Sequence, residues 1–145
     1  MYTGGCLCGA VRYEVRGPLR DVIACHCNEC RRSSSHYVAA TAAHREHLSM
    51  TESKGLAWYS SSQYLRRGFC KLCGSTLFFD HGDGKPTGIA AGSLDQDPGL
   101  KLAVHIYVDE AGRYFDIGDD SVPQMDTQTW RATGWDNMKW TADIE

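Results

Sequence analysis

The sequence predicts a single domain that is mostly β. Short apolar segments recur along the chain and are separated by turn signals rich in glycine and proline. The length of 145 residues suits one domain. A content of 42% hydrophobic and 23% charged residues is ordinary for a globular protein. No apolar run approaches the roughly 20 residues that span a bilayer, so we expect no membrane segment.

The first expected strand shows the alternation of a half-buried sheet. Residues 10–16 place Val11, Tyr13 and Val15 on one face and charged residues on the other. The Gly-Pro pair at 17–18 ends this strand. Residues 25–30 are so dense in cysteine that we expect a tight loop there. The other strand candidates are, in order, 21–25, 37–43, 48–51, 56–60, 64–69, 75–80, 87–91, 102–108 and 114–117.

The C-terminal part has a different pattern. Trp130, Trp135 and Trp140 are spaced by five residues, which suits neither a helix nor a strand well. We therefore expect residues 1–126 to form the domain and residues 127–145 to form a tail that packs its indoles on it.

Charge and the N-terminal residues limit the compartment and the partners. A net charge of −3 and a pI near 6.0 argue against a nucleic-acid partner. Residues 1–9 lack the basic and apolar stretches of a signal peptide, so we expect a cytoplasmic protein. Thiols stay reduced in the cytoplasm, where clustered cysteines are more often metal ligands than disulfides.

The cysteines are the most informative residues of the sequence. Their number, seven, is odd, so they cannot all pair as disulfides within one chain. They fall into three groups: Cys6 and Cys8; Cys25, Cys27 and Cys30; Cys70 and Cys73.

Two of these groups have the form of half-sites for a structural metal. The C-x-x-C-G sequence that ends at Gly74 can turn two sulfurs toward one centre, but a structural zinc takes four ligands. Cys6 and Cys8 are the natural second pair. We therefore expect Cys6, Cys8, Cys70 and Cys73, the four-cysteine cluster, to hold a structural zinc that ties the N-terminus to the middle of the chain.

The remaining group, Cys25, Cys27 and Cys30, is the three-cysteine cluster. Three protein ligands and one exchangeable position are typical of a catalytic zinc, which a substrate thiol could reach. Three thiolates and Zn²⁺ leave one net negative charge, and a substrate thiolate adds another. Arg31 and Arg32 follow this cluster directly and could offset that charge. The pair at 66–67 is a second basic candidate close to a cysteine group.

Two other interpretations of the three-cysteine cluster, and the role of Glu29, remain open. Cys27 and Cys30 could form a thioredoxin-type redox pair, although no helix is expected after the preceding strand. Glu29 could carry a proton or be an ordinary loop carboxylate. A histidine could close the cluster as a second structural zinc site, and the candidates are His26, His36, His44, His47, His81 and His105. Of these, His26 lies between two ligands and should point away from the metal.

Six segments, which together span about residues 2–126, share a family pattern. They are 4–13, 25–31, 67–78, 88–94, 105–108 and 122–125. With the seven cysteines in order, they resemble the glutathione-dependent formaldehyde-activating enzyme family, also called the centromere protein V/formaldehyde-activating domain. Residues 114–115 are Tyr-Phe where this family often has a tryptophan.

The resemblance implies a zinc-bound β-tent, an arrangement of complex antiparallel sheets with zinc knuckles. It also implies two zinc ions, a structural one in the four-cysteine cluster and a catalytic one in the three-cysteine cluster. The activity implied is the condensation of formaldehyde with glutathione to S-hydroxymethylglutathione, classed as a carbon–sulfur lyase. Because glutathione carries two carboxylates, Arg31 and Arg32 are candidates to bind it.

Two functions are consistent with these observations. The first is a zinc-dependent carbon–sulfur lyase that acts on an adduct of an aldehyde with glutathione or another small thiol. The alternative is a non-enzymatic zinc module that recognises a protein or a nucleic acid. A titration with DNA at several salt concentrations separates the two, because binding driven by phosphate contacts must weaken steeply as the salt concentration rises. The sequence does not indicate an oligomeric state.

Overall fold

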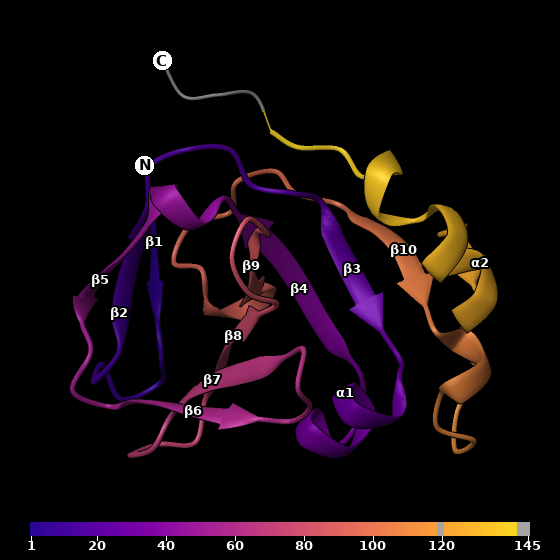
Figure 1. Cartoon of the computed structure of the whole chain (residues 1–145), viewed down its shortest axis with the longest axis horizontal. Helices are drawn as coiled ribbons and strands as arrows, with labels where there is room; N and C mark the ends of the chain where they lie inside the picture. Colours follow the sequence, from indigo (N-terminus) through magenta and orange to yellow (C-terminus); the bar gives the residue numbers. More distant parts are fainter. Residues whose placement is uncertain (119–120, 142–145) are drawn as a thin grey trace.

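The computed structural model describes residues 1–118 and 121–141, so residues 142–145 of the expected tail lie outside the described part. Figure 1 shows two sheets that lean against each other. The smaller sheet has the strand order β1-β2-β5, and its neighbours are antiparallel. Its strands are β1 (Tyr2–Gly5), β2 (Arg12–Val15) and β5 (Leu48–Glu52).

The larger sheet has eight strands in the order β11-β10-β3-β4-β9-β8-β7-β6. Most neighbours are antiparallel, whereas β10 runs parallel to both β3 and β11. The prediction of a mostly β fold with antiparallel sheets is confirmed, and the parallel edge is an addition to it. The strands are β3 (Val22–Cys25), β4 (Val38–Ala43), β6 (Leu56–Ser60), β7 (Arg66–Cys70), β8 (Thr76–Asp80), β9 (Thr87–Ala90), β10 (Leu102–Ile106) and β11 (Gln124–Met125).

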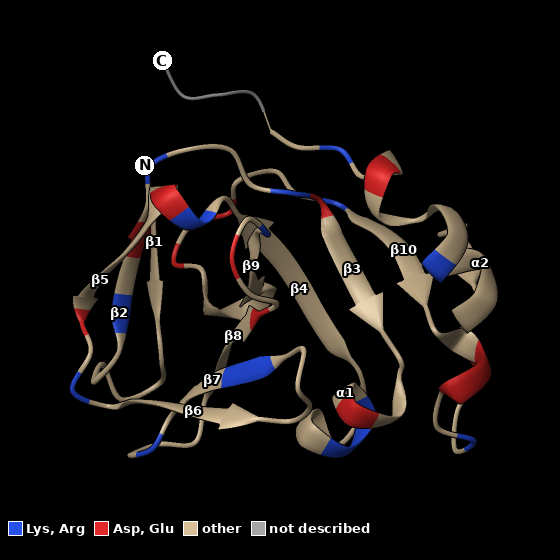
Figure 2. Ribbon diagram, viewed as in Figure 1, with Lys and Arg blue, Asp and Glu red and all other residues tan. Residues whose placement is uncertain are grey.

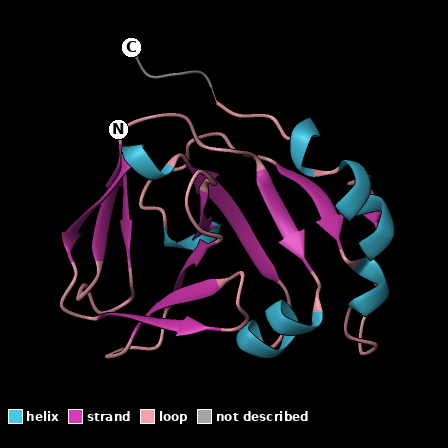
Figure 3. Ribbon diagram, viewed as in Figure 1, coloured by secondary structure: helices cyan, strands magenta, loops and turns pink. Residues whose placement is uncertain are grey.

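The helices are short, and most of them lie at the periphery of the sheets (Figure 3). Within the described residues, none is long and apolar enough to cross a membrane. The α-helices are α1 (Asn28–Ser34) and α2 (Thr127–Thr133). The 3₁₀ turns are η1 (Arg45–His47), η2 (Ala91–Ser93), η3 (Val108–Glu110) and η4 (Trp135–Asn137).

Two sequence-based expectations about local structure are wrong. The tight loop expected over residues 25–30 is instead the end of β3 followed by the start of α1. Cys27 caps this helix, because its Sγ accepts a hydrogen bond from the backbone N–H of Cys30 at 3.4 Å. The strand expected over residues 114–117 does not form.

The main core lies between the two sheets. The apolar face of β2, expected from its alternation, is buried: Tyr13 and Val15 are at most 1% exposed. Tyr13 meets Phe78 of β8 edge to face, with ring centroids 5.3 Å apart. A second cluster joins Ile23 of β3 to Trp130 of α2, so this indole of the C-terminal segment packs on the large sheet.

Candidate functional site

The four-cysteine cluster is built from two turns that are far apart in sequence. The four Sγ atoms all lie within 4.8 Å of one another. Each turn ends in a glycine with positive φ, Gly9 at 84° and Gly74 at 79°, a conformation that favours glycine. The amide of Gly74 donates to the carbonyl of Cys70 at 2.7 Å and closes the second turn.

Hydrogen bonds fix these sulfurs and join the two turns. The backbone N–H of Val11 donates to Cys6 Sγ at 3.2 Å, and that of Leu7 donates to Ser75 Oγ at 3.1 Å. Hydrogen bonds from Ser75 also lower the pKa of Cys73 to about 5. The geometry therefore presents four sulfurs, among them the readily ionised Cys73, which suits a tetrahedral structural metal.

The three-cysteine cluster forms where β3 passes into α1. Cys25 ends the strand, Cys27 caps the helix and Cys30 lies in its first turn, so their Sγ atoms also lie within 4.8 Å of one another. No histidine nitrogen within residues 1–118 and 121–141 joins this group. His26 is 1% exposed, and its Nε2 instead lies 3.0 Å from Nδ1 of His105. The described part of the chain therefore offers this cluster no histidine as a fourth ligand.

Arg67 of β7 places a positive charge on this cluster. Its Nη1 and Nη2 atoms lie 3.8 and 3.7 Å from Cys30 Sγ and donate to it. Glu29 at 3.3 Å and Ser33 at 3.2 Å hold the guanidinium, which also lies 5.5 Å from the ring centroid of Phe79. Figure 2 shows this basic strand facing the charged residues of α1. At 7% exposed, Arg67 acts where water screens its charge little.

The three thiols affect one another strongly. Hydrogen bonds from Cys25 and Cys30, together with the charge of Arg67, lower the pKa of Cys27 to about 2. Hydrogen bonds to Cys27 and Cys30 and burial raise the pKa of Cys25 far above its usual range. One thiolate is thus favoured without a metal, and three close sulfurs need a cation before all of them can ionise. The donor set fits such a metal.

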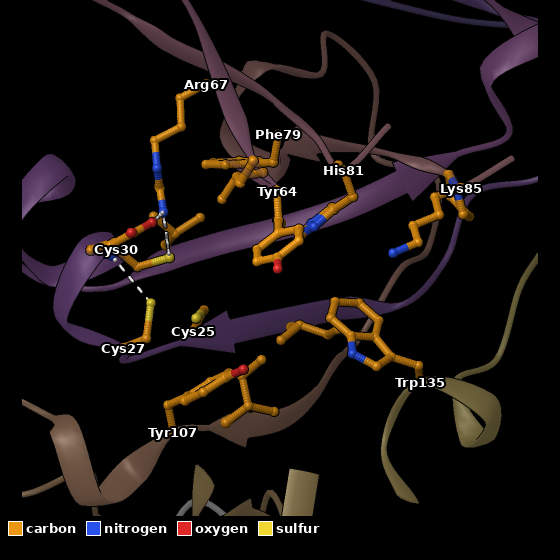
Figure 4. A pocket seen from close by; sticks show the side chains of 18 of the residues that line it. Cys25, Cys27, Cys30, Tyr64, Arg67, Phe79, His81, Lys85, Tyr107 and Trp135 are labelled. Atoms are coloured by element: carbon orange, nitrogen blue, oxygen red, sulfur yellow. Dashed lines mark hydrogen bonds and ion pairs between the residues drawn. The ribbon is translucent and has the colours of Figure 1, made fainter. Parts of the chain in front are cut away.

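The three-cysteine cluster lines one end of a cavity of about 970 Å³. The cavity runs along β3 and β4, and His81, Lys85 and Trp135 line its other end (Figure 4). Tyr107 lines it beside the cysteines, and Tyr64 lines it between the two ends. The four-cysteine cluster does not line this cavity.

The structure brings Arg67 to the cavity and leaves out the other basic candidates. Arg31 donates to Asn28 Oδ1 on its own helix at 2.9 Å, and Arg32 is exposed; neither lines the cavity. Arg66 points to the opposite face of β7, where its Nε donates to Asp80 at 2.7 Å. Period-two alternation along the strand is the signal that separates Arg66 from Arg67.

The start of α1 bears on the redox-pair interpretation of Cys27 and Cys30. A helix does begin directly after Cys27, so the absence of a helix no longer separates the two interpretations. What favours a ligand set is the third sulfur, Cys25, which a two-cysteine redox pair does not need. All seven cysteines are free thiols. Both clusters could therefore bind metal ions.

Similarity to known proteins bears on the family and the fold of the chain. The family model described as glutathione-dependent formaldehyde-activating enzyme matches residues 1–110. An uncharacterized lyase of Schizosaccharomyces pombe is 35% identical over 85 residues, which cover 58% of this chain. The chain spans 61% of the length of that relative. A crystal structure of a Rhodobacter sphaeroides protein, 22% identical, has the same fold with a TM-score of 0.56 and covers 84% of this chain and 98% of its own. The chain belongs to the glutathione-dependent formaldehyde-activating enzyme family.

Proposed function

We propose that the protein is a zinc-dependent carbon–sulfur lyase that acts on adducts of glutathione, or a similar small thiol, with an aldehyde such as formaldehyde. The family and the lyase-named relative support a glutathione-related function of the lyase type. The single observation that carries the proposal is the position of the three-cysteine cluster at the end of a cavity of about 970 Å³, beside the buried Arg67.

The reaction forms or breaks one carbon–sulfur bond and moves one proton. In the direction of condensation, the thiol sulfur forms a bond to the carbonyl carbon, the carbon–oxygen π bond opens, and the thiol proton ends on the former carbonyl oxygen. In the opposite direction, the carbon–sulfur bond breaks and the hydroxyl proton returns to sulfur. Zinc held by Cys25, Cys27 and Cys30 would lower the pKa of a thiol that enters the cavity.

The residues of the chain balance the charge and move the proton. A substrate thiolate would add a second negative charge to the three-cysteine cluster with its metal, and Arg67 offsets one of the two. Glu29 lines the same cavity and is held by Arg67 at 3.3 Å. We assign to its carboxylate the transfer of the proton between sulfur and oxygen. The four-cysteine cluster would hold a second zinc, and this zinc would stabilise the fold.

The Cys27→Ser variant tests this proposal. Turnover is the rate at which glutathione and formaldehyde exchange with their adduct, measured by NMR exchange spectroscopy and corrected for the uncatalysed rate. We expect the intact protein to hold two zinc ions per chain, and the variant to stay folded, hold one and lose activity. Circular dichroism and metal analysis control for folding. If the variant keeps one zinc and full activity, the proposed function is wrong.

A further inference from the structure

We propose that Tyr64 and Trp135 form an aromatic slot that selects adducts whose aldehyde-derived part is a flat apolar ring. This inference rests on the proposed function, because the ring is the part of the adduct that the aldehyde supplies. The bonds made and broken are those given above: sulfur to carbonyl carbon, with the thiol proton passing to oxygen.

The size of the cavity is the first observation. Its volume of about 970 Å³ lies at the upper end of the roughly 300–1,000 Å³ typical of small-molecule sites. Formaldehyde contributes a single carbon and its oxygen, which would occupy little of this space beyond the thiol. Apolar side chains of the sheet, among them Val38, Ala40 and Ile106, line part of the cavity. The cavity therefore has apolar space for a larger aldehyde.

The two rings are the second observation. Tyr64 lies in the turn between β6 and β7 and is 74% exposed, and Trp135 begins η4 and is 50% exposed. Both line the cavity, and Figure 4 shows them on facing sides of it. Large aromatic side chains that stay this exposed in a cavity gain contact area when a flat apolar group enters between them.

Trp135 is held in place from the protein side. Its ring lies 4.9 Å from that of the buried Trp130 and 5.9 Å from that of His81, measured between centroids. The guanidinium carbon of Arg20 lies 5.6 Å from the Trp135 ring. Arg20 is 7% exposed and pairs with no carboxylate in the described part of the chain. A ring fixed in this way loses little freedom when it binds a ligand.

The slot lies partly outside the part of the chain that the family model covers. That match ends at residue 110 and includes all seven cysteines, whereas Trp135 lies beyond it. The shared part would thus supply the thiol chemistry, and the C-terminal segment would select the aldehyde. Glutathione is polar and carries two carboxylates, so an apolar slot suits the part of the adduct that glutathione does not supply.

Binding of stable glutathione conjugates tests the slot without turnover. Isothermal calorimetry would compare S-benzylglutathione, which carries a ring, with S-methylglutathione, which does not. We expect the intact protein to bind the benzyl conjugate about tenfold more tightly. Tyr64→Ala and Trp135→Ala should each reduce this ratio to within about threefold, and Trp135→Phe should restore most of it. The control is Tyr59→Ala, because Tyr59 is 64% exposed on neighbouring β6 but does not line the cavity.

The outcomes separate this inference from the proposed function. Equal affinities for the two conjugates, or a ratio unchanged in both alanine variants, would overturn the slot even if the protein turns over the formaldehyde adduct. A ratio that falls only in the cavity variants would support the slot even if no aldehyde adduct is turned over, in which case the proposed function fails alone.

Discussion

The two cysteine clusters use the same donor atom in opposite surroundings. Four sulfurs converge where two turns with left-handed glycines, Gly9 and Gly74, meet. The other three converge where a strand ends and a helix begins, beside the buried Arg67 and a cavity of about 970 Å³. The donor chemistry alone thus does not distinguish a structural site from a reactive one. The number of sulfurs, the neighbouring charge and the adjoining cavity do.

Topology adds a second difference. The four-cysteine cluster joins the loop between β1 and β2 to the turn between β7 and β8, so a metal there links the small sheet to the large one. The three-cysteine cluster lies within a single β3–α1 connection. We therefore expect the first metal to support the fold and the second to be dispensable for it.

Cys70→Ser should have the largest effect, because it removes a sulfur that is completely buried in the four-cysteine cluster. Metal that holds a small domain together stabilises the folded state directly, so the free energy of unfolding should fall by more than about 4 kcal/mol. Urea unfolding followed by circular dichroism measures the loss. Cys27→Ser is the matched substitution in the three-cysteine cluster and should cost far less. An equal loss of unfolding free energy in the two variants would contradict the proposed difference between the clusters.

Arg67→Gln should have a smaller and more local effect. Removal of the charge next to Cys30 should lower both turnover and the zinc affinity of the three-cysteine cluster by roughly 10–100-fold. Because Arg67 lowers the pKa of Cys27, the pH at which zinc binds this cluster should rise in the variant. The four-cysteine cluster should bind zinc as before.

The controls for Arg67 separate its charge from general effects. Arg67→Lys should restore part of the zinc affinity, because it keeps the positive charge without the two donors. The side chain of Arg16, which directly follows β2, is 68% exposed. Arg16→Gln should therefore change neither turnover nor zinc binding. An unchanged pH profile of zinc binding in Arg67→Gln would show that this arginine only fills space.

Much of the fold could be predicted from the sequence, because period-two alternation reports which face of a strand is buried. The grouping of the cysteines followed from their number and spacing, and the structure brings them together in those groups. Helix α1 was missed because it has only seven residues and its cap is a cysteine sulfur, an unusual N-cap. A short helix packed on a sheet leaves little periodic signal.

The cavity could not be predicted in the same way. Arg31 and Arg32 are adjacent to Cys30 in sequence, yet Arg67 contacts its sulfur because β7 passes α1 in space. Tyr64 and Trp135 meet the cavity from segments about seventy residues apart, and no local pattern links them. Contacts between distant segments depend on the completed topology, so only the structure reveals them.

The most direct test of the central claim asks whether a thiol enters the three-cysteine cluster. Cobalt(II) substituted for zinc gives sulfur-to-metal charge-transfer absorption that increases with the number of bound thiolates. We predict that glutathione raises this absorption in the intact protein by the amount that one additional bound thiolate contributes. In Cys27→Ser, glutathione should leave the absorption unchanged. Absorption that glutathione does not alter in the intact protein, or alters equally in both proteins, would contradict the account.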